Sequence, residues 1–470
     1  MALPARPKLL VLVIVEQFRP DYLDFAASSL ASGGFRRLLD KGAFFPDCRH
    51  LASTFPASSI ATLATGAWPA QHGIAADSWY DRSIRKAVPA SDEALLATSL
   101  ASQVVAEPAN RVTIVSLNEP HGALFAGTPD ARLFSMDETG QFSTPGDPPD
   151  WLAAFNAAKN PAGLHGARWL ALGAKPDAPA LRTLTFSPSH PAEFLALYKS
   201  SPFAQDAQFD LAMELIDREK LGQGGTFDFL CILAGSTGLL GYETGALSPL
   251  MRQMTLRLDQ KIESLLNQLA KAPGEKNFSF VIVGAHGAPP EPATDMRDRM
   301  AVSGETVAQA VDRYLHATGS GRVEKYVYPF LYLDTSGFRD PEPVRQAAAR
   351  AAMDHPAVAG YFTAGGACST HDEWERRFRN SFHPVRSGDV ILSYQPEYIE
   401  DYSQGRGISY GSLYNYDVQA PLVFYGPQFR PGVFEAPVES VDVAPTLARA
   451  IGVAAPSSST GRVLGEALVE

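Results

Sequence analysis

Five apolar runs, each ending in small or polar residues, are the sequence feature that most constrains the fold of this chain. The runs are LLVLVIV (9–15), RVTIVSL (111–117), FDFLCILAG (227–235), FSFVIVGA (278–285) and APLVFYG (420–426). Helical patterns separate them, for example in the stretch 247–271. This alternation is typical of a central, mostly parallel β-sheet sandwiched by helices. We therefore expect an α/β fold.

Residues just after the strands of such a sheet carry its chemistry, because the carboxyl ends of parallel strands share one edge. Four stretches follow the apolar runs in this way, at 16–17, 116–121, 235–242 and 284–287. We expect the functional residues among them.

Composition excludes several classes of protein. Of the 470 residues, 45% are hydrophobic and 19% are charged, as in a folded enzyme-sized domain rather than a disordered or fibrous chain. The net charge of −11 is spread along the chain without a cluster of Lys and Arg, so we expect no nucleic-acid partner. Three separated cysteines, Cys48, Cys231 and Cys368, argue against a disulfide framework and against a Cys-based zinc site.

The N-terminal apolar run is too short to span a membrane, and Glu16 and Arg19 follow it without a small-residue cleavage site. We interpret this run as the first strand. We therefore expect no membrane partner and a cytoplasmic location.

Five segments carry motifs in a familiar order: 6–23 with 33–45, then 61–82, 201–242, 280–287, and 386–426 with 438–453. They contain VEQFRPDYL, ATGAWPAQHGI, GSTGLLGY, GAHG and SYGSLYNYD. On these segments the chain resembles the phosphate-monoesterase branch of the alkaline phosphatase superfamily, with nucleotide pyrophosphatases and phosphodiesterases as more distant relatives. The resemblance covers nearly the whole chain and implies an alkaline-phosphatase-like fold.

The resemblance also implies a chemistry. In that family, Asp carboxylates and His imidazoles hold two zinc ions that clamp a phosphoryl group while a Thr or Ser attacks phosphorus. The ligand positions map onto Glu16, Gly238, Tyr242, Ala285, His286 and Tyr410. Glycine and alanine offer no ligand, a neutral phenol with a pKa of about 10 is a poor one, and a lone imidazole cannot hold zinc. We therefore expect no metal cofactor, although two zinc ions are the family norm.

Structural roles are the simpler interpretation for several of these residues. Glu16 replaces an Asp with a longer side chain, and we expect an ion pair with Arg19 or Arg37 rather than metal ligation. For His286 we expect a hydrogen-bonded structural role. Two interpretations of the tyrosines stay open: their phenols fill the space of the missing ligands and hydrogen-bond to each other or to His286, or drift merely tolerated bulky residues there.

The nucleophile position has three candidates. An ungapped alignment anchored on 65–66 places the attacking Thr on Pro56, which has no hydroxyl. The phosphodiesterase relatives carry their Thr directly before Phe-Pro, which selects Thr54 instead. Ser58 is the third candidate.

The expected phosphate pocket is altered as well. Asp77 stands where the family has an Asn, and its charge would repel a phosphate. Asn118 and Pro120 stand where the family has a Lys and an Arg, so both cations that would pair with phosphate oxygens are missing.

These changes are correlated, whereas divergence of an active enzyme would spare the groups that contact metal and substrate. Our leading hypothesis is a pseudoenzyme that binds an unidentified ligand or protein partner. The alternative is a phosphate- or sulfate-ester hydrolase with a rebuilt site, acting through Thr54 or Ser58 with Glu16, His286 and at most one metal. A purely structural subunit that pairs with an active paralogue is the third class.

We expect a single domain over 1–470. Its core is expected at about 1–81, 205–296 and 386–470, with cap insertions at about 82–204 and 297–385. By resemblance, the insertions would form a lid over the site.

Overall fold

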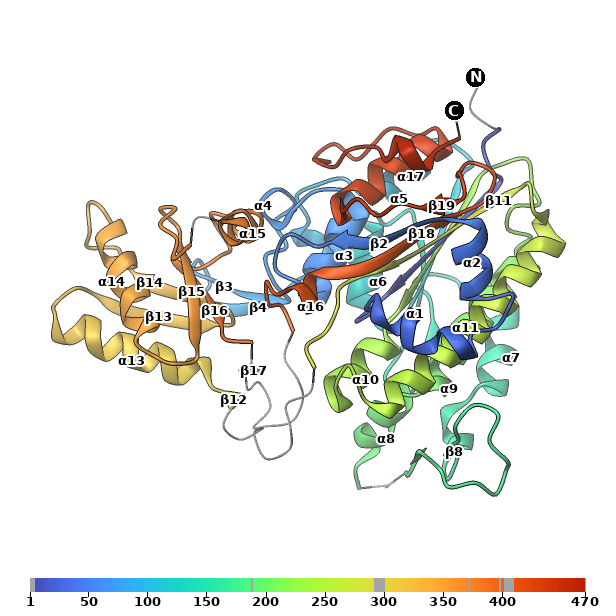
Figure 1. Ribbon diagram of the computed structural model, residues 1–470, viewed down its shortest axis with the longest axis horizontal. Coiled ribbons are helices and arrows are strands. Elements are labelled where there is room, and N and C mark those ends of the chain that lie inside the picture. The colour runs from blue at the N-terminus through green and yellow to red at the C-terminus, as the bar shows by residue number, and fades with distance from the viewer. Residues whose placement is uncertain are drawn as a thin grey trace.

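The computed structural model describes residues 5–186, 189–290, 301–370, 372–396, 399–400 and 410–469. Figure 1 shows two lobes, a large core built around a central sheet and a smaller lobe that extends from one side of it. We call this smaller lobe the cap, meaning the described residues between 301 and 396, which carry their own sheet and helices.

A ten-stranded sheet organises the core. The strand order is β19 (Gly432–Val433), β2 (Ala43–Arg49), β18 (Gln419–Tyr425), β11 (Phe278–Gly284), β1 (Leu9–Val15), β10 (Asp228–Ala234), β5 (Arg111–Ser116), β6 (Arg132–Met136) and β7 (Phe142–Ser143), with β20 (Val438–Glu439) paired to β2. The pairings from β11 through β6 are parallel, while β18 and β7 run antiparallel to their neighbours. The predicted α/β class with a central, largely parallel sheet is confirmed.

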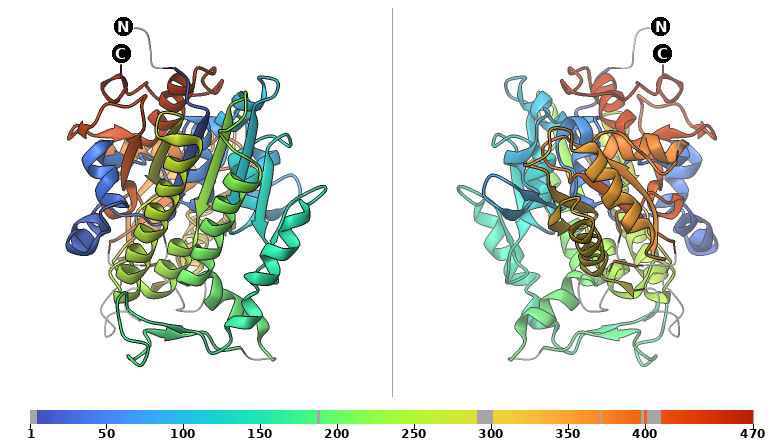
Figure 2. Two further views of the ribbon diagram at one scale, coloured as in Figure 1. Left: turned by 90° about the vertical axis from the view of Figure 1, so that its right-hand side faces the viewer. Right: turned by 90° about the vertical axis from the view of Figure 1, so that its left-hand side faces the viewer.

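Helices cover both faces of this sheet, because successive strand residues point to opposite sides. Leu9, Val11, Val13 and Val15 join one buried cluster, and the even-numbered residues of β1 join another. The first face is covered by α1 (Asp21–Ala26), α2 (Phe35–Lys41), α7 (Asp150–Ala158), α8 (Pro191–Lys199), α9 (Pro202–Arg218), α10 (Ser236–Thr244) and α11 (Pro249–Leu269). The second is covered by α3 (Pro56–Thr65), α5 (Leu100–Val105), α6 (Glu119–Ala126) and α17 (Val443–Ile451). The left view of Figure 2 shows α9 and α11, in green and yellow-green, lying along the sheet.

The register of the central strands brings their carboxyl ends to one edge. Val15 pairs with Ala234 on one side and with Gly284 on the other, and Leu233 pairs with Ser116. The residues that follow these four strands therefore meet at the same edge, as expected for parallel pairing.

The cap contains an antiparallel sheet packed between helices and the core. Its order is β13 (Arg322–Val327), β14 (Phe330–Asp334), β16 (Val390–Tyr394) and β15 (Val358–Thr363), with helices α13 (Gly304–Ala317), α14 (Glu342–Met353) and α15 (Glu373–Ser381). Leu331 and Leu333 of β14 pack with α13 and α14. Phe330 and Tyr332, which alternate with them, pack in a cluster that includes Phe55 of the core.

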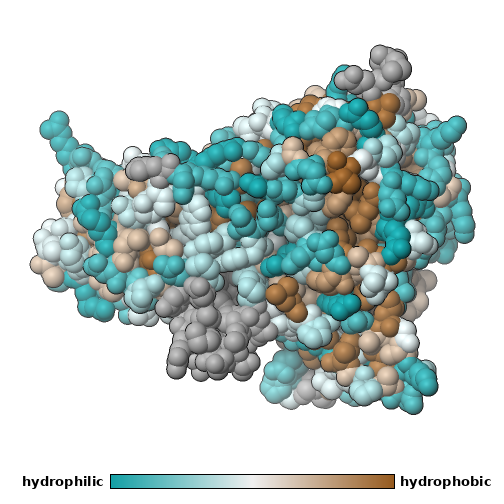
Figure 3. Space-filling view, viewed as in Figure 1, coloured by the Kyte–Doolittle hydropathy of each residue, from teal (hydrophilic) through white to brown (hydrophobic). Residues whose placement is uncertain are grey.

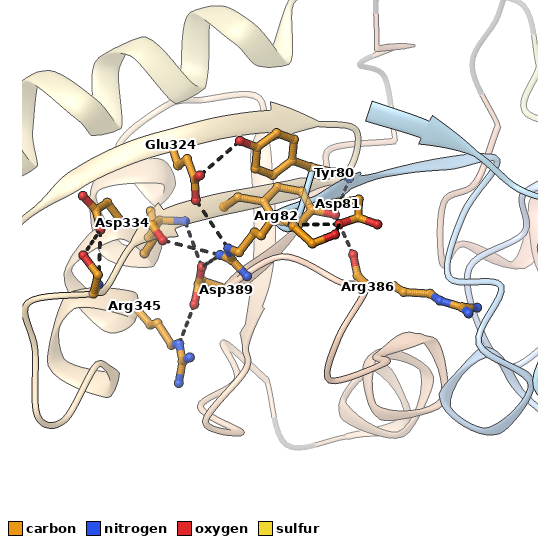
Figure 4. Close-up of polar contacts among 12 residues, drawn as sticks. Tyr80, Asp81, Arg82, Glu324, Asp334, Arg345, Arg386 and Asp389 are labelled. Atoms are coloured by element: carbon orange, nitrogen blue, oxygen red, sulfur yellow. Dashed lines mark hydrogen bonds and ion pairs between the residues drawn. The ribbon is translucent and has the colours of Figure 1, made fainter. Parts of the chain in front are cut away.

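A polar network also ties the cap to the core hairpin formed by β3 (Ser78–Asp81) and β4 (Lys86–Pro89), as Figure 4 shows. Asp389 is 3% exposed and accepts hydrogen bonds from Arg82 and, at 2.9 Å, from Arg345. The hydroxyl of Tyr80 donates to Glu324 at 3.0 Å. The end of β3 and the turn after it are thus held against the cap.

Two of the predicted boundaries are wrong. Strands β5, β6 and β7 lie within 82–204, expected to be a cap insertion, yet they belong to the central sheet. Strand β16 was expected in the core and is instead a middle strand of the cap sheet. The reason is that an apolar run shows that a strand is buried but not which sheet it joins. Residues 297–300 of the second expected insertion lie outside the described residues.

The molecular surface differs between the lobes. On the face shown in Figure 3, hydrophobic residues gather in a band over the core, whereas the cap is mostly hydrophilic. Within the described ranges, every helix is too short or too polar to cross a bilayer.

Candidate functional site

Glu16 and Gly238 form the centre of the candidate site. Glu16 follows β1 and is 9% exposed, and Gly238 lies in the first turn of α10. A Cβ atom added at Gly238 would lie 2.5 Å from Oε2 and 2.8 Å from Cβ of Glu16. The longer carboxylate side chain therefore occupies the space in which a side chain at 238 would begin.

The Glu16 carboxylate is paired with an imidazole. Nδ1 of His121 lies 3.1 Å from Oε1 of Glu16 and also 3.1 Å from Nδ2 of Asn118. Burial lowers the pKa of His121, but the ion pair with Glu16 and the charge of Asp77 outweigh burial, so the pKa is raised above its usual value. A protonated Nδ1 donates to Glu16 and cannot accept from Asn118.

Asn118 has a local structural role. Its side-chain Oδ1 accepts a hydrogen bond from the backbone N–H of His121 at 2.8 Å, which caps the N-terminus of α6. Asn118, which is predicted at a phosphate-clamp position, thus fixes the backbone of the histidine that pairs with Glu16.

The three nucleophile candidates follow one another at the start of α3. Pro56 is the first residue of the helix and is buried. The hydroxyl of Thr54 is buried and donates to the carbonyl of Ser412 at 3.0 Å, and the hydroxyl of Ser58 is buried and donates to the carbonyl of Ile74 at 2.9 Å. Both hydroxyls are therefore already engaged with backbone acceptors.

Aromatic rings surround the remaining predicted positions. The Tyr410 ring lies 6.2 Å from that of Tyr242 in a T-shaped arrangement and 5.5 Å from the imidazole of His286. Burial, together with the charges of Asp77 and Glu16, raises the pKa of Tyr410, so its phenol is neutral at physiological pH. The prediction of hydrogen bonds among these three rings remains a prediction.

His286 and Ala285 follow β11 and are fully buried. Nδ1 of His286 donates to the carbonyl of Gly287 at 2.7 Å, because a carbonyl can only accept. Burial lowers the pKa of His286, which keeps its imidazole neutral. Among the described residues, its Nε2 has no hydrogen-bond partner.

Asp77 brings a second carboxylate to the site. Its Oδ1 accepts the backbone N–H of Ala57 at 3.0 Å, close to the N-terminus of α3. Burial raises the pKa of Asp77 above its usual value, and the neighbouring Glu16 acts in the same direction.

A pocket lies between this cluster and the cap, and we call it the aromatic pocket. It has a volume of about 470 Å³, is partly open to solvent, and is lined by Phe55, Asp77, Ser78, Tyr242, Tyr326, Val327, Tyr328 and Tyr410. Tyr326 and Tyr328 come from the cap, at β13 and just beyond it, and the other aromatic residues come from the core.

The donor atoms present do not fit a zinc site. Structural and catalytic zinc sites need three or four protein ligands at tetrahedral positions. In the part of the chain that the structure describes, no group of three or more His, Cys, Asp or Glu side chains is arranged to hold a metal ion. Glu16 is paired with His121, and Nε2 of His286 has no hydrogen-bond partner among the described residues.

The structure thus brings the six predicted ligand positions, the nucleophile candidates and Asp77 to one edge of the sheet. The predicted partners of Glu16 are wrong: Arg19 pairs with Asp21, and Arg37 pairs with Glu275. The sequence pattern did not indicate that Asp21 and Glu275 would be the partners of these two guanidinium groups.

Sequence reasoning missed three residues of the site. His121 closes a stretch that follows a predicted strand, and the Asn118 cap three residues earlier was the available signal. Tyr326 and Tyr328 enter from the cap, and no sequence signal connects them with the strand ends.

Comparisons with known proteins place the chain among relatives of this architecture. A family model described as type I phosphodiesterase / nucleotide pyrophosphatase matches residues 10–399. Alkaline phosphatase PhoV of Synechococcus elongatus is 25% identical over 99% of this chain and 93% of its own length. Alkaline phosphatase PafA of Elizabethkingia meningoseptica is 26% identical over 98% of this chain and 95% of its own. The crystal structure of wild-type PafA matches with a TM-score of 0.87 and 23% identity, covering 100% of both chains.

Proposed function

Because this chain belongs to the type I phosphodiesterase / nucleotide pyrophosphatase family of the alkaline phosphatase superfamily, we propose that it is a pseudoenzyme that keeps the family fold to bind a ligand or a protein partner. The observation that carries this proposal is the packing of Glu16 into the space of a side chain at 238. With Glu16 in this position, a family ligand at 238 has no room.

Two further observations support the proposal. The ungapped nucleophile position is Pro56, and the hydroxyls of Thr54 and Ser58 are buried against backbone carbonyls. Asn118, at a phosphate-clamp position, caps a helix and carries no charge. The candidate nucleophiles and this clamp position are therefore replaced or engaged elsewhere, as phosphoryl transfer would not allow.

A hydrolase with a rebuilt site is the alternative, since the relatives PhoV and PafA are named alkaline phosphatases. It would need Thr54 or Ser58 to leave its carbonyl and a base to activate it. The imidazole of His286 is neutral and could act as a base, but its Nδ1 donates to the carbonyl of Gly287, its ring lies beside that of Tyr410, and neither hydroxyl is hydrogen-bonded to it.

The test is zinc loading of the purified full chain, followed by elemental analysis and a p-nitrophenyl phosphate assay. Alkaline phosphatase PafA, loaded and assayed in the same way, is the positive control. We expect no stoichiometric zinc and no turnover above background. Stoichiometric zinc together with turnover that disappears on chelation would overturn the proposal in favour of the hydrolase.

A second arm tests the partner. Pull-down from the source organism would recover a related chain with a full ligand set if the protein is a structural subunit of an active paralogue. Recovery of no such chain leaves ligand binding as the function to pursue, through the aromatic pocket.

A further inference from the structure

The walls of the aromatic pocket are rings held in place from both lobes. Phe55 packs edge-on against Tyr328 at 5.5 Å and against Tyr410 at 6.4 Å between ring centroids. The hydroxyl of Tyr326 is hydrogen-bonded to that of Tyr394 at 2.7 Å. Since each ring has a defined packing partner, the pocket presents fixed aromatic surfaces rather than mobile side chains.

The described lining of the pocket carries negative charge. Among its described lining residues, Asp77 is the only ionisable group besides the phenols, and Lys and Arg are absent. Glu16 lies beside it, but its charge is balanced by His121, whose pKa is raised. Asp77 is therefore the carboxylate whose charge a bound ligand would meet.

We propose that the aromatic pocket binds an organic monocation of the quaternary or tertiary ammonium class. Such a cation is attracted by the faces of Tyr and Phe rings, and several rings around one ammonium group form a cage for it. Asp77 supplies the compensating charge, and no Lys or Arg among the described lining residues would repel such a ligand. This inference rests on the proposed function, because it names the ligand class of the same site.

The experiment uses isothermal titration calorimetry of the full chain with choline and with its uncharged isostere, in which a tert-butyl group replaces the trimethylammonium group. Inorganic phosphate is the anionic probe. We expect one-to-one binding of choline, binding of the isostere weaker by about tenfold or more, and no binding of phosphate. Equal affinity for choline and the isostere, binding of phosphate alone, or no binding of choline at millimolar concentration would overturn the proposal.

Variants locate the site. Tyr242→Leu and Tyr328→Leu each remove one ring and should weaken choline binding about fivefold. Asp77→Asn keeps an oxygen for the N–H of Ala57 and should weaken it by about tenfold through loss of charge. Tyr314→Leu, at a 45% exposed position on α13 that does not line the pocket, is the matched control and should leave binding unchanged.

A thermal melt of each variant distinguishes lost binding from lost folding, and the wild-type comparison of choline with its isostere needs no variant. The zinc and turnover assays on the same preparation separate the two proposals. If choline does not bind and no turnover is seen, only the proposed cation site is refuted. Turnover that a chelator abolishes refutes the pseudoenzyme proposal, whether or not choline binds.

Discussion

Replacing Gly238 by Ala tests the packing on which the proposed function rests. The added methyl group would lie 2.5 Å from Oε2 and 2.8 Å from Cβ of Glu16, closer than real Cβ contacts allow. Glu16 would have to move, and its hydrogen bond with His121 at 3.1 Å would be lost.

The expected cost follows from three effects. Overpacking a buried contact costs about 1–3 kcal/mol. Loss of a hydrogen bond between charged groups costs about 1.5–3 kcal/mol. Ala in place of Gly within α10 returns about 1 kcal/mol through helix propensity. We therefore expect Gly238→Ala to lower the free energy of unfolding by about 3 kcal/mol.

The measurement is urea unfolding followed by tryptophan fluorescence and circular dichroism, with coincident transitions required before a free energy is derived. Gly235→Ala is the matched control, because it lies at the start of the same helix and its Cβ would meet Oε1 of Glu16 at an ordinary 3.4 Å. It should change stability by less than about 0.5 kcal/mol. In a Glu16→Ala background the cost of Gly238→Ala should shrink. Equal stability of the two glycine variants would refute the reasoning.

Three other predictions address the surroundings. Burial raises the pKa of Asp417 to about 7 in the folded state, although the hydrogen bonds that it accepts from Ser412 act in the opposite direction. Its protonated form therefore stabilises the fold fully below about pH 4, and this stabilisation is lost as the pH rises through 7. Unfolding free energies from pH 4 to 8 should therefore fall less steeply in Asp417→Asn than in the wild type, and parallel slopes would contradict this. Asp389→Ala removes the acceptor for Arg82, Arg345 and the backbone N–H of Leu333, and should destabilise the chain by about 2–3 kcal/mol. The expected signs are a lower melting temperature and faster proteolysis of the cap. Wild-type behaviour in both assays would argue against a role of Asp389 in holding the cap to the core. Pro56→Thr restores a hydroxyl without a metal site and should give no turnover of p-nitrophenyl phosphate, so turnover in this variant would count against the pseudoenzyme.

The fold was predictable because a continuous apolar run is a local signal of a buried strand. The run from Leu9 to Val15 is apolar throughout, as a strand covered on both faces must be, and its partners show the same pattern. The end of each run also predicts the sheet edge at which Glu16 and Gly238 meet. The same reasoning does not assign β16 to the cap, because the sequence of a strand does not indicate which distant strand it pairs with.

The pairing within the site was less predictable. The partner of Glu16 was expected among arginines, whose charge is evident from sequence, whereas His121 acquires its raised pKa only from its position beside Glu16 and Asp77. The aromatic pocket depends on Tyr326 and Tyr328, which the cap fold brings to the core across a long sequence separation.

The contact between Glu16 and Gly238 has a consequence for the history of the chain. An aspartate gained at 238 meets the existing glutamate, and an aspartate gained at 16 still faces a glycine that donates nothing. Neither substitution alone recovers a ligand pair, and the first is penalised before any benefit arises. Under the proposed function, return to metal chemistry therefore requires both changes, and the change at 16 has to come first, so this packing sets the order of any reversal.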